Sequence, residues 1–279
     1  MEKTKTLTIN DITIGGGAPF VLIAGPCVIE DEVRTMGIAD ALKKIVTSVG
    51  VPLIFKASYD KANRTSVDSF RGPGLKQGLA ILQKVKEHFA LPILSDVHRF
   101  EEIVPAAAIV DVIQIPAFLC RQTDFVAEIA RHAQTVNIKK GQFLAPWDVE
   151  HIIQKAEKAG NDRIMITERG TCFGYNNLVV DFRSLSILHS FGYPVVFDAT
   201  HSVQLPGGAG SASAGDREMV PSLSRAAVAV GIDALFWEVH PDPDCALCDG
   251  SNSLKLGNIA GLLVLLKEMD QMVKSKANG

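Results

Sequence analysis

The stretch that decides the fold reads Val51-Pro52-Leu53-Ile54-Phe55-Lys56-Ala57-Ser58-Tyr59-Asp60-Lys61-Ala62-Asn63-Arg64-Thr65-Ser66. It begins as a short apolar run, which is typical of a strand covered on both faces. It then brings together lysine, arginine, asparagine and hydroxyl side chains, which suit an anion such as a phosphate or a carboxylate. Taken alone, the polar half could equally be a basic loop exposed to solvent, so the rest of the chain must decide.

The apolar run has counterparts along the whole chain. Short runs rich in β-branched and other apolar residues occur at 20–24, 51–55, 92–94, 110–115, 136–138, 163–167, 195–197 and 234–239. Segments of helical length and period lie between them, at 31–46, 75–89, 123–132, 147–159, 181–191 and 217–230, and an amphipathic pattern continues from Ile259 to Val273. The segment after Glu101 is the weakest of the expected helices because it contains Pro105.

This alternation, without a proline- or serine-rich linker, predicts one α/β domain over residues 1–279, a (β/α)8 TIM barrel. A doubly wound open sheet is the structural alternative. Ahead of the first run, residues 6–15 alternate apolar and polar on both sides of Asn10-Asp11, which predicts a β-hairpin. We expect this hairpin, within residues 1–17, to plug or cap the barrel.

Composition indicates small-molecule partners. Of 279 residues, 47% are apolar and 21% are charged, which is ordinary for a globular protein. A net charge of -3 gives no general attraction to nucleic acid or to an acidic membrane, so any anion site must be local. We expect a cytoplasmic protein, because no run approaches the ~18 apolar residues of a membrane span and no secretory signal is recognisable. The five cysteines do not suggest a disulfide framework and are expected to be reduced.

Polar and ionisable residues follow nearly every strand-like run. In a TIM barrel these positions meet at one rim, where the active sites of this fold lie. The residues at these strand ends, including a few that are not polar, are Gly25, Pro26, Cys27, Lys56, Ser58, Lys61, Asn63, Arg64, Asp96, His98, Gln114, Pro116, Ala117, Lys139, Lys140, Glu168, Arg169, Asp198, His201, Glu238, His240 and Asp242. Two longer loops join this rim: residues 203–216 are rich in glycine and flexible enough for a lid, and residues 242–253 carry Cys245, Cys248 and Asp249.

Five strings in this set are long enough to identify a family. They are Lys56-Ala57-Ser58-Tyr59-Asp60-Lys61-Ala62-Asn63-Arg64, Gln114-Ile115-Pro116-Ala117-Phe118-Leu119-Cys120-Arg121-Gln122-Thr123-Asp124, Asn137-Ile138-Lys139-Lys140-Gly141-Gln142-Phe143, Thr167-Glu168-Arg169-Gly170 and Asp198-Ala199-Thr200-His201-Ser202. Together they resemble the 3-deoxy-D-manno-octulosonate 8-phosphate synthases. The similarity extends from about Phe20 to Asp249.

The resemblance implies a homotetrameric barrel enzyme that condenses phosphoenolpyruvate with D-arabinose 5-phosphate and releases inorganic phosphate, in the pathway to lipopolysaccharide. A related synthase uses erythrose 4-phosphate to make a 3-deoxy-heptulosonate 7-phosphate. It typically has Pro-Arg-Thr after the second lysine, where this chain reads Ala62-Asn63-Arg64-Thr65, and the difference favours the five-carbon sugar. A non-catalytic sugar-phosphate sensor is a further alternative, which would keep the anion-binding cations but would not need a metal site.

The resemblance also assigns the binding residues. Those for phosphoenolpyruvate are Lys56, Lys61, Gln114, Ala117, Lys139 and Arg169, and those for arabinose 5-phosphate are Ser58, Asn63, Arg64 and, from a neighbouring subunit, Arg121. Asp96 and His98 are expected to line the floor of the pocket. Lys140 should point the opposite way from Lys139, which favours a solvated or structural role.

The loop after the first strand sets the expected metal dependence. The metal-dependent branch of the family has cysteine there and the metal-independent branch has asparagine, and this chain has Cys27. By resemblance its co-ligands are His201, Glu238 and Asp249. Such a mixed site suits zinc or ferrous iron, with manganese or cobalt as alternatives. Without the resemblance, Cys27 would be read as a small buried hydrophobe, Glu238 as an ion-pair partner and Asp249 as a turn cap.

The catalytic residues expected from the family are His201, Asp249, Lys139 and Asp96, with the first two near the transferred proton. Cys245 and Cys248 form a Cys-x-x-Cys pair that could be a redox pair or half a zinc site. The chain has no second pair to complete a four-thiolate site, and this pair lies after the last strand. We therefore expect no function for it.

Overall fold

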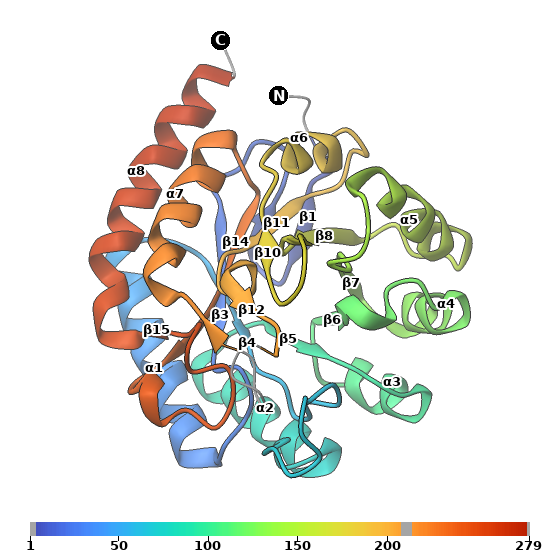
Figure 1. Cartoon of the computed structure of the whole chain (residues 1–279), viewed down its shortest axis with the longest axis vertical. Helices are drawn as coiled ribbons and strands as arrows, with labels where there is room; N and C mark the ends of the chain where they lie inside the picture. The colour runs from blue at the N-terminus through green and yellow to red at the C-terminus, as the bar shows by residue number, and fades with distance from the viewer. Residues whose placement is uncertain (1–3, 208–213, 278–279) are drawn as a thin grey trace.

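The computed structural model of the chain describes residues 4–207 and 214–277. Within these ranges, eight parallel strands form a barrel that is surrounded by helices (Figure 1). The barrel strands are β3 (Val21–Gly25), β4 (Leu53–Lys56), β5 (Ile93–Asp96), β6 (Val112–Ile115), β7 (Thr135–Lys139), β8 (Ile164–Glu168), β11 (Val195–Asp198) and β14 (Ala234–His240). Strand β14 pairs in parallel with both β3 and β11, so the ring is closed. The predicted (β/α)8 barrel is confirmed, and the open-sheet alternative is wrong.

The barrel strands are buried along their whole length, because one face points into the barrel and the other packs under the helices. Their register brings the carboxyl ends to one level. Glu238 pairs with Gly25 at this end, and Asp96 pairs with Gln114. The polar residues that the sequence places after the strands therefore share one rim.

Helices alternate with the barrel strands and cover the outside of the barrel. They are α1 (Glu32–Val49), α2 (Leu75–Phe89), α3 (Phe100–Ala107), α4 (Thr123–His132), α5 (Val149–Lys158), α6 (Arg183–His189), α7 (Val220–Val230) and α8 (Ile259–Ala277). The weakest expected helix, α3, does form around Pro105. Its residues Ile103 and Ala106 are buried in the core, so packing offsets the hydrogen bond that the proline removes.

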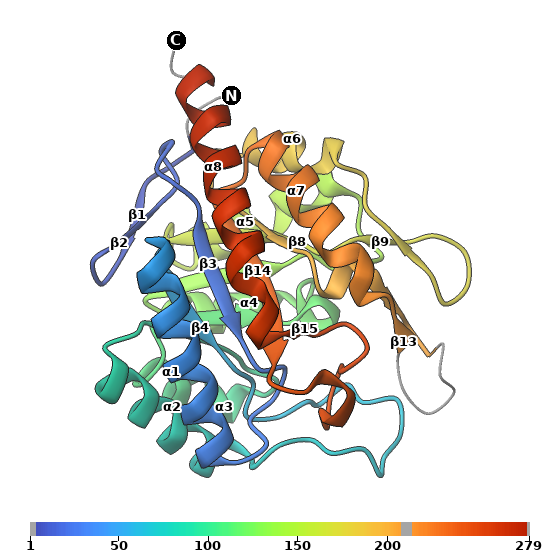
Figure 2. The same ribbon diagram turned by 90° about the vertical axis from the view of Figure 1, so that its left-hand side faces the viewer.

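The hairpin formed by β1 (Leu7–Ile9) and β2 (Ile12–Ile14) closes the amino-terminal end of the barrel. Its apolar side chains form one buried cluster with the residues that fill the barrel interior. That cluster consists of Leu7, Ile9, Ile12, Ile14, Val21, Ile23, Ile54, Leu94, Val112, Met165, Val196, Ala234 and Phe236. Figure 2 shows the hairpin at the end of the barrel opposite to β9 and β13. The expected plug is present, and it leaves the other end open for a site.

Several short elements at the rim were not predicted. They are the strands β9 (Thr171–Cys172), β10 (Leu178–Val179), β12 (Gln204–Leu205), β13 (Ala214–Gly215) and β15 (Leu254–Lys255), and the 3-10 helices Ala117–Leu119, Pro146–Asp148, His201–Val203, Arg217–Met219, Pro243–Cys245 and Leu256–Asn258. The lid expected at 203–216 begins and ends in the paired strands β12 and β13, and its residues 208–213 lie outside the described ranges. No helix in the described ranges has the length and apolar character needed to cross a membrane.

Candidate active site at the carboxyl rim of the barrel

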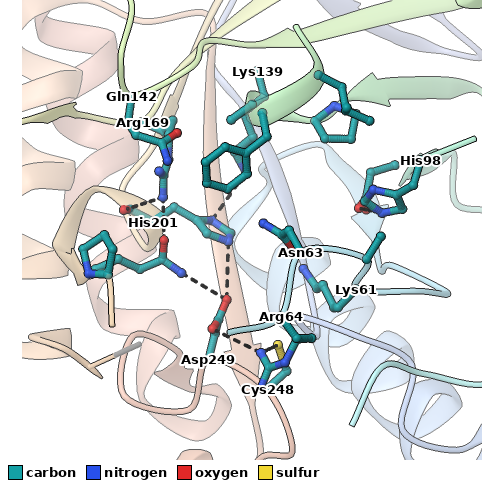
Figure 3. Close-up of a pocket in the computed structure, with 18 of the residues that line it drawn as sticks. Lys61, Asn63, Arg64, His98, Lys139, Gln142, Arg169, His201, Cys248 and Asp249 are labelled. Atoms are coloured by element: carbon teal, nitrogen blue, oxygen red, sulfur yellow. Dashed lines mark hydrogen bonds and ion pairs between the residues drawn. The ribbon is translucent and has the colours of Figure 1, made fainter. Parts of the chain in front are cut away.

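A cavity of about 370 Å³ opens where the carboxyl ends of the barrel strands meet. Figure 3 shows side chains from several strand ends converging on this space. The sequence-predicted residues that line it are Lys56, Lys61, Asn63, Arg64, Asp96, His98, Gln114, Ala117, Lys139, Arg169, His201 and Asp249. Ser58, Cys27 and Glu238 are buried and are linked to the lining by hydrogen bonds and ion pairs. The sequence therefore predicted most of the wall.

Lys56 and Lys61 flank a buried carboxylate on the inner wall. Lys56 Nζ lies 3.0 Å from Glu238 Oε1 and donates to the backbone oxygen of Cys27, also at 3.0 Å. Lys61 Nζ lies 3.7 Å from the same Glu238 oxygen. The strands approach so closely here that a Cβ at Gly25 would overlap the backbone oxygen of Lys56. Glycine at the end of β3 is therefore required for this arrangement.

Electrostatics keep Glu238 charged inside the barrel. Burial alone would raise its pKa, but His201, Lys56, Lys61 and Lys139 hold the pKa of this carboxyl well below its ordinary value. The Glu238 side chain is thus a carboxylate in a site rich in positive charge. Such a group can either balance the lysines or bind a cation.

Ser58, Asp96 and His98 form a fixed network at the floor. Ser58 Oγ donates to Asp96 Oδ1 at 2.5 Å, and His98 Nε2 lies 2.9 Å from Asp96 Oδ2. Burial opposes the charged form of both groups, but their mutual attraction raises the pKa of His98 and holds the pKa of Asp96 well below its ordinary value. Both oxygens of Asp96 are thus engaged, and this carboxylate orients its neighbours.

Asp198, at the end of β11, holds a histidine and a lysine together. Its Oδ2 lies 2.7 Å from His201 Nδ1 and 2.5 Å from Lys139 Nζ. Burial lowers the pKa of Lys139 below its ordinary value, against the opposing attraction of Asp198. The contact at Nδ1 turns the other ring nitrogen, Nε2, toward Glu238 and Asp249. His201 is therefore oriented as a ligand with a supporting carboxylate.

Arg169 and Arg64 approach the cavity from two different loops. Arg169 Nη2 donates to the backbone oxygen of His201 at 3.1 Å and to Gln204 Oε1 at 2.5 Å. Arg64 Nη1 donates to the sulfur of Cys248 at 2.7 Å and lies 3.8 Å from Asp249 Oδ1. The Nε atoms of both arginines are buried and have no hydrogen-bond partner among the residues the structure describes. Each guanidinium brings a positive charge to the wall of the cavity, as an anion site requires.

Three side chains next to these cations, those of His201, Glu238 and Asp249, are spaced like ligands of one metal ion, and Cys27 lies beside Asp249. His201 Nε2 lies 3.5 Å from Glu238 Oε1 and 3.8 Å from Asp249 Oδ2. Cys27 Sγ lies 3.5 Å from the same oxygen of Asp249. Donors bound to one ion at about 2.0–2.3 Å in a tetrahedral site are about 3.3–3.8 Å apart. Oε2 of Glu238 is also buried without a hydrogen-bond partner in the described part of the chain. Three of the donors predicted from the sequence therefore fit a divalent metal ion, and the fourth, Cys27, meets this group at Asp249.

Cys248 is a member of this cluster that sequence reasoning rejected. Its Sγ lies 2.9 Å from Cys27 Sγ, and Cys27, Cys248 and Asp249 together form a second group of donors close enough to share an ion. Two sulfurs bound to one tetrahedral ion would be about 3.8 Å apart, so the observed 2.9 Å is shorter than the spacing of two thiolate ligands, and we expect only one of the two sulfurs to bind the ion. Cys245, its partner in the Cys-x-x-Cys pair, is exposed.

The sequence analysis assigned no role to three other residues, Asp198, Gln142 and Gln204, which belong to the site or touch its residues. Asp198 was expected at the rim, and a role could have been assigned to it, since a carboxylate three residues before a predicted histidine ligand is a recurrent arrangement. Gln142 lies in the loop after β7 and Gln204 at the start of β12, and the sequence does not determine the path of either segment. Cys248 precedes a predicted ligand, but its direction depends on Asp249, which has a positive φ of 49°.

Arg121 and Lys140 do not line the cavity. Arg121 is exposed and lies beside a second cavity, which shares His98 and Leu119 with the first. Lys140 is completely buried and contacts backbone oxygens outside the barrel wall. Of the two roles expected for Lys140, the structural one is observed and the solvated one is wrong.

The arrangement can bind small molecules that carry several negative charges. Lys61, Arg64, Lys139 and Arg169 surround one enclosed space, while the chain as a whole carries a net charge of -3. Cations gathered in this way repel one another unless anions join them. The adjacent donor cluster adds a place for a Lewis acid. The site is therefore equipped for chemistry on phosphorylated or carboxylated substrates.

Comparison with known proteins gives consistent matches over the chain. Residues 2–275 match the DAHP synthetase I family. A protein of Geotalea uraniireducens (strain Rf4), named 2-dehydro-3-deoxyphosphooctonate aldolase, is 63% identical over 97% of this chain and 99% of its own length. Proteins of the same name from Geotalea daltonii and Geobacter sulfurreducens are 61% and 60% identical, each over 97% of this chain.

Proposed function

Because the chain belongs to the DAHP synthetase I family, we propose that it is the member that makes 3-deoxy-D-manno-octulosonate 8-phosphate. It is an enzyme, as are the relatives that cover nearly its full length and are named for this product. The reaction joins phosphoenolpyruvate to D-arabinose 5-phosphate, consumes water and releases inorganic phosphate. In this proposal the protein acts on small molecules in the cytoplasm.

The observation that carries the proposal is the convergence of four buried or half-buried cations on one cavity. Two phosphates and a carboxylate must be held close together in this reaction, and they need several fixed positive charges. Lys61 and Lys139 supply point charges, whereas Arg64 and Arg169 offer forked donors that match phosphate.

The phosphoenolpyruvate half of the cavity lies beside Arg169 and Lys139. Lys61 approaches from the opposite wall, and Lys56 lies beneath it against Glu238. Gln114 and Ala117, which also line the cavity, complete this half. Because these side chains are held by the barrel strands and their first loop residues, the anion sites exist before the substrate arrives.

The sugar phosphate half lies toward the loop that contains Asn63 and Arg64. Ser58 supports this side from below through Asp96, and His98 borders it. We further propose that the enzyme is a homotetramer in which Arg121 reaches the arabinose 5-phosphate site of a neighbouring subunit. Arg121 is exposed and does not line the cavity of its own chain, which supports this arrangement.

The metal proposal, a site made of Cys27, His201, Glu238 and Asp249, is supported by the spacing of the last three and by the contact of Cys27 with Asp249. A divalent ion held by these residues would supply a Lewis acid for the aldehyde oxygen of the sugar. The mixed thiolate, imidazole and carboxylate set favours zinc or ferrous iron, with manganese or cobalt as alternatives. Burial and the neighbouring thiol of Cys248 raise the pKa of Cys27, so the metal-free site keeps its proton and metal binding releases it.

The bond changes define what the residues must do. The third carbon of phosphoenolpyruvate bonds to the aldehyde carbon, and the aldehyde oxygen gains a proton. Water adds to the second carbon, and the resulting hemiketal phosphate loses inorganic phosphate by cleavage of its carbon–oxygen bond. Negative charge is redistributed at each step, and the fixed cations Lys61, Lys139 and Arg169 stabilise it without reorganisation.

Lys139 is the residue best placed to move a proton. Its pKa is lowered by burial, which makes the ammonium a stronger acid than an exposed lysine. Its Nζ lies 3.4 Å from His201 Nδ1 and 2.5 Å from Asp198. In this proposal His201 and Asp249 lie at the reacting aldehyde as ligands, while Asp96 orients the floor through Ser58 and His98.

The test of the proposal is a competition between sugars. The enzyme is given phosphoenolpyruvate with equal amounts of arabinose 5-phosphate and erythrose 4-phosphate, and the products are identified by mass. The proposal predicts that the eight-carbon product dominates. A predominance of the seven-carbon product would assign the enzyme to the erythrose 4-phosphate reaction, and binding of either sugar without turnover would favour a sensor.

A further inference from the structure

A buried ion pair lies outside the barrel wall, directly behind two of the proposed substrate cations. Lys140 Nζ is 3.5 Å from Glu168 Oε1, and both side chains are buried. Neighbouring residues on a strand face opposite sides. Lys139 and Arg169 therefore enter the cavity, while the adjacent Lys140 and Glu168 face outward and meet each other.

The ammonium group of Lys140 connects two rim loops. It lies 3.3 Å from the backbone oxygen of Leu144, in the loop after β7. It also lies 3.5 Å from the backbone oxygen of Gly170 and 3.2 Å from Thr171 Oγ1, in the loop after β8. These contacts make Lys140 a common donor for the loops that carry Gln142 and Arg169. Movement of either loop would leave a buried charge with fewer partners.

The carboxylate of Glu168 fixes the backbone at the start of the second loop. Its Oε1 accepts the backbone N–H of Arg169 at 3.0 Å and that of Gly170 at 2.7 Å. Gly170 has a φ of 88°, a conformation that favours glycine. The tight turn directs the Arg169 side chain inward, where it reaches His201 and Gln204.

Stability alone does not account for this pair. Burial of two charges costs free energy that their attraction often fails to recover, so an apolar pair of similar size is frequently as stable. Oε2 of Glu168 is also buried without a hydrogen-bond partner within the described ranges. This unfavourable burial occurs next to Arg169, whose side chain must be held in place although nearby cations repel it.

We propose that Lys140 and Glu168 are positioning residues that set Arg169 for phosphoenolpyruvate. The inference deepens the proposed function and rests on it. Neither residue lines the cavity, and the Glu168 carboxylate contacts Arg169 only at its backbone N–H, so both act through the turn that they fix. A shift of about 1 Å at the Arg169 guanidinium is enough to lower binding and rate substantially.

The test compares Lys140→Met, Glu168→Gln and the double variant with a matched control. Methionine removes the charge and keeps the length of the side chain, and glutamine keeps an oxygen that can accept the two backbone N–H groups. The control is His189→Gln, which breaks another buried pair, in which His189 Nε2 lies 3.0 Å from Asp233 at the plugged end of the barrel. Thermal unfolding of all variants measures the loss of stability common to them.

The dissociation constant for phosphoenolpyruvate and the KM for arabinose 5-phosphate are measured for each folded variant. We expect the single variants to bind phosphoenolpyruvate about tenfold more weakly, with the KM for the sugar changed less than about threefold. We expect the double variant to lose little more than the worse single variant, because both residues act through one turn. The control should lose stability without this selective loss.

Two results would overturn the inference. One is unchanged phosphoenolpyruvate affinity in Glu168→Gln, the milder variant. The other is an equal loss for both substrates, matched by His189→Gln, which would reduce the pair to a stabilising role. If the unmodified enzyme itself fails to bind phosphoenolpyruvate, the proposed function fails instead, so the two failures are distinguishable.

Discussion

Asp198 holds His201 at two points. Its Oδ2 lies 2.7 Å from the Nδ1 atom of the imidazole, and its Oδ1 accepts the backbone N–H of His201 at 2.9 Å. The same carboxylate contacts Lys139. One buried group thus fixes both the orientation of a proposed metal ligand and the position of a proposed proton donor.

We predict that Asp198→Asn lowers both metal affinity and kcat by about 10- to 100-fold, because the amide does not carry the charge that orients His201 and Lys139. Metal content after dialysis and steady-state rates measure the two effects. Asp181→Asn is the control, since Asp181 pairs with Arg183 at the surface. If the two variants had the same metal content and the same kcat, Asp198 would have no specific role in the site.

The two neighbouring thiols should differ in function. Cys27→Ser is expected to abolish tight binding of zinc or ferrous iron, because a soft ligand is lost. Cys248→Ser is expected to retain the metal, since the sulfur spacing accommodates one thiolate ligand. Metal content by mass spectrometry of the purified variants decides this. Loss of metal in both variants, or only in Cys248→Ser, would contradict the assigned ligand set.

The two arginines should separate the two substrates. Arg169→Lys is predicted to raise the KM for phosphoenolpyruvate about tenfold or more, because lysine cannot reproduce a forked contact with an anion. Arg64→Lys should raise the KM for arabinose 5-phosphate by a similar factor. Steady-state kinetics with each substrate varied in turn provide the comparison. If Arg169→Lys instead raised the KM for arabinose 5-phosphate and Arg64→Lys that for phosphoenolpyruvate, the assignment of the two substrates to the two halves of the cavity would be reversed.

The Asp96–His98 pair predicts a pH-dependent contribution to stability. The pKa of His98 is raised from 6.5, so its contribution is complete below pH 6.5 and is lost as the pH rises through the raised pKa. The pKa of Asp96 is held well below 3.8, so its contribution is present above pH 3.8 and is lost only at more acidic pH. Glu102 and Lys61 also act on His98, in opposite directions.

Urea unfolding of the native enzyme and of His98→Gln tests this sign. The difference in unfolding free energy should be largest between about pH 4 and pH 6.5 and should shrink as the pH rises further. A difference that is constant across this range, or that grows above pH 7, would show that the charged pair is not the source of the stabilisation.

The hairpin should matter for stability and not for substrate binding. Ile14 is fully buried in the cluster that fills the barrel interior. Ile14→Ala is predicted to lower the free energy of unfolding by about 2–5 kcal/mol through cavity formation, with both KM values unchanged. Val33→Ala, at an exposed position of α1, serves as the control. A change in KM for either substrate would link the plug to the active site.

The barrel could be predicted because its signals are local and repeated. Each apolar run, such as 51–55, is followed by polar residues, and the parallel arrangement brings those residues to one rim. The residues of the site that belong to strand ends, including Lys56, Asp96 and Lys139, follow directly from this rule. The resemblance to a family added roles for them that periodicity does not provide.

The remaining site residues depend on contacts between distant segments. Cys248 meets Cys27 across a separation of 221 residues, and nothing local to either cysteine shows that they meet. Gln204 enters the site because β12 turns back toward Arg169. Strand alternation predicts that Lys140 points away from the barrel interior, but it does not predict whether the side chain is exposed there or buried under the surrounding helices and loops. These features could not be predicted from the sequence and are visible only in the structure.

The central claim is that this enzyme releases phosphate from phosphoenolpyruvate and arabinose 5-phosphate with the aid of a metal ion at Cys27, His201, Glu238 and Asp249. The most direct measurement is phosphate release before chelation, after chelation, and after zinc, ferrous iron, manganese and cobalt are added back one at a time. We predict that chelation removes the activity and that at least one of these ions restores it. Full activity after complete metal removal would contradict the metal site, and absence of phosphate release under every condition would contradict the synthase itself.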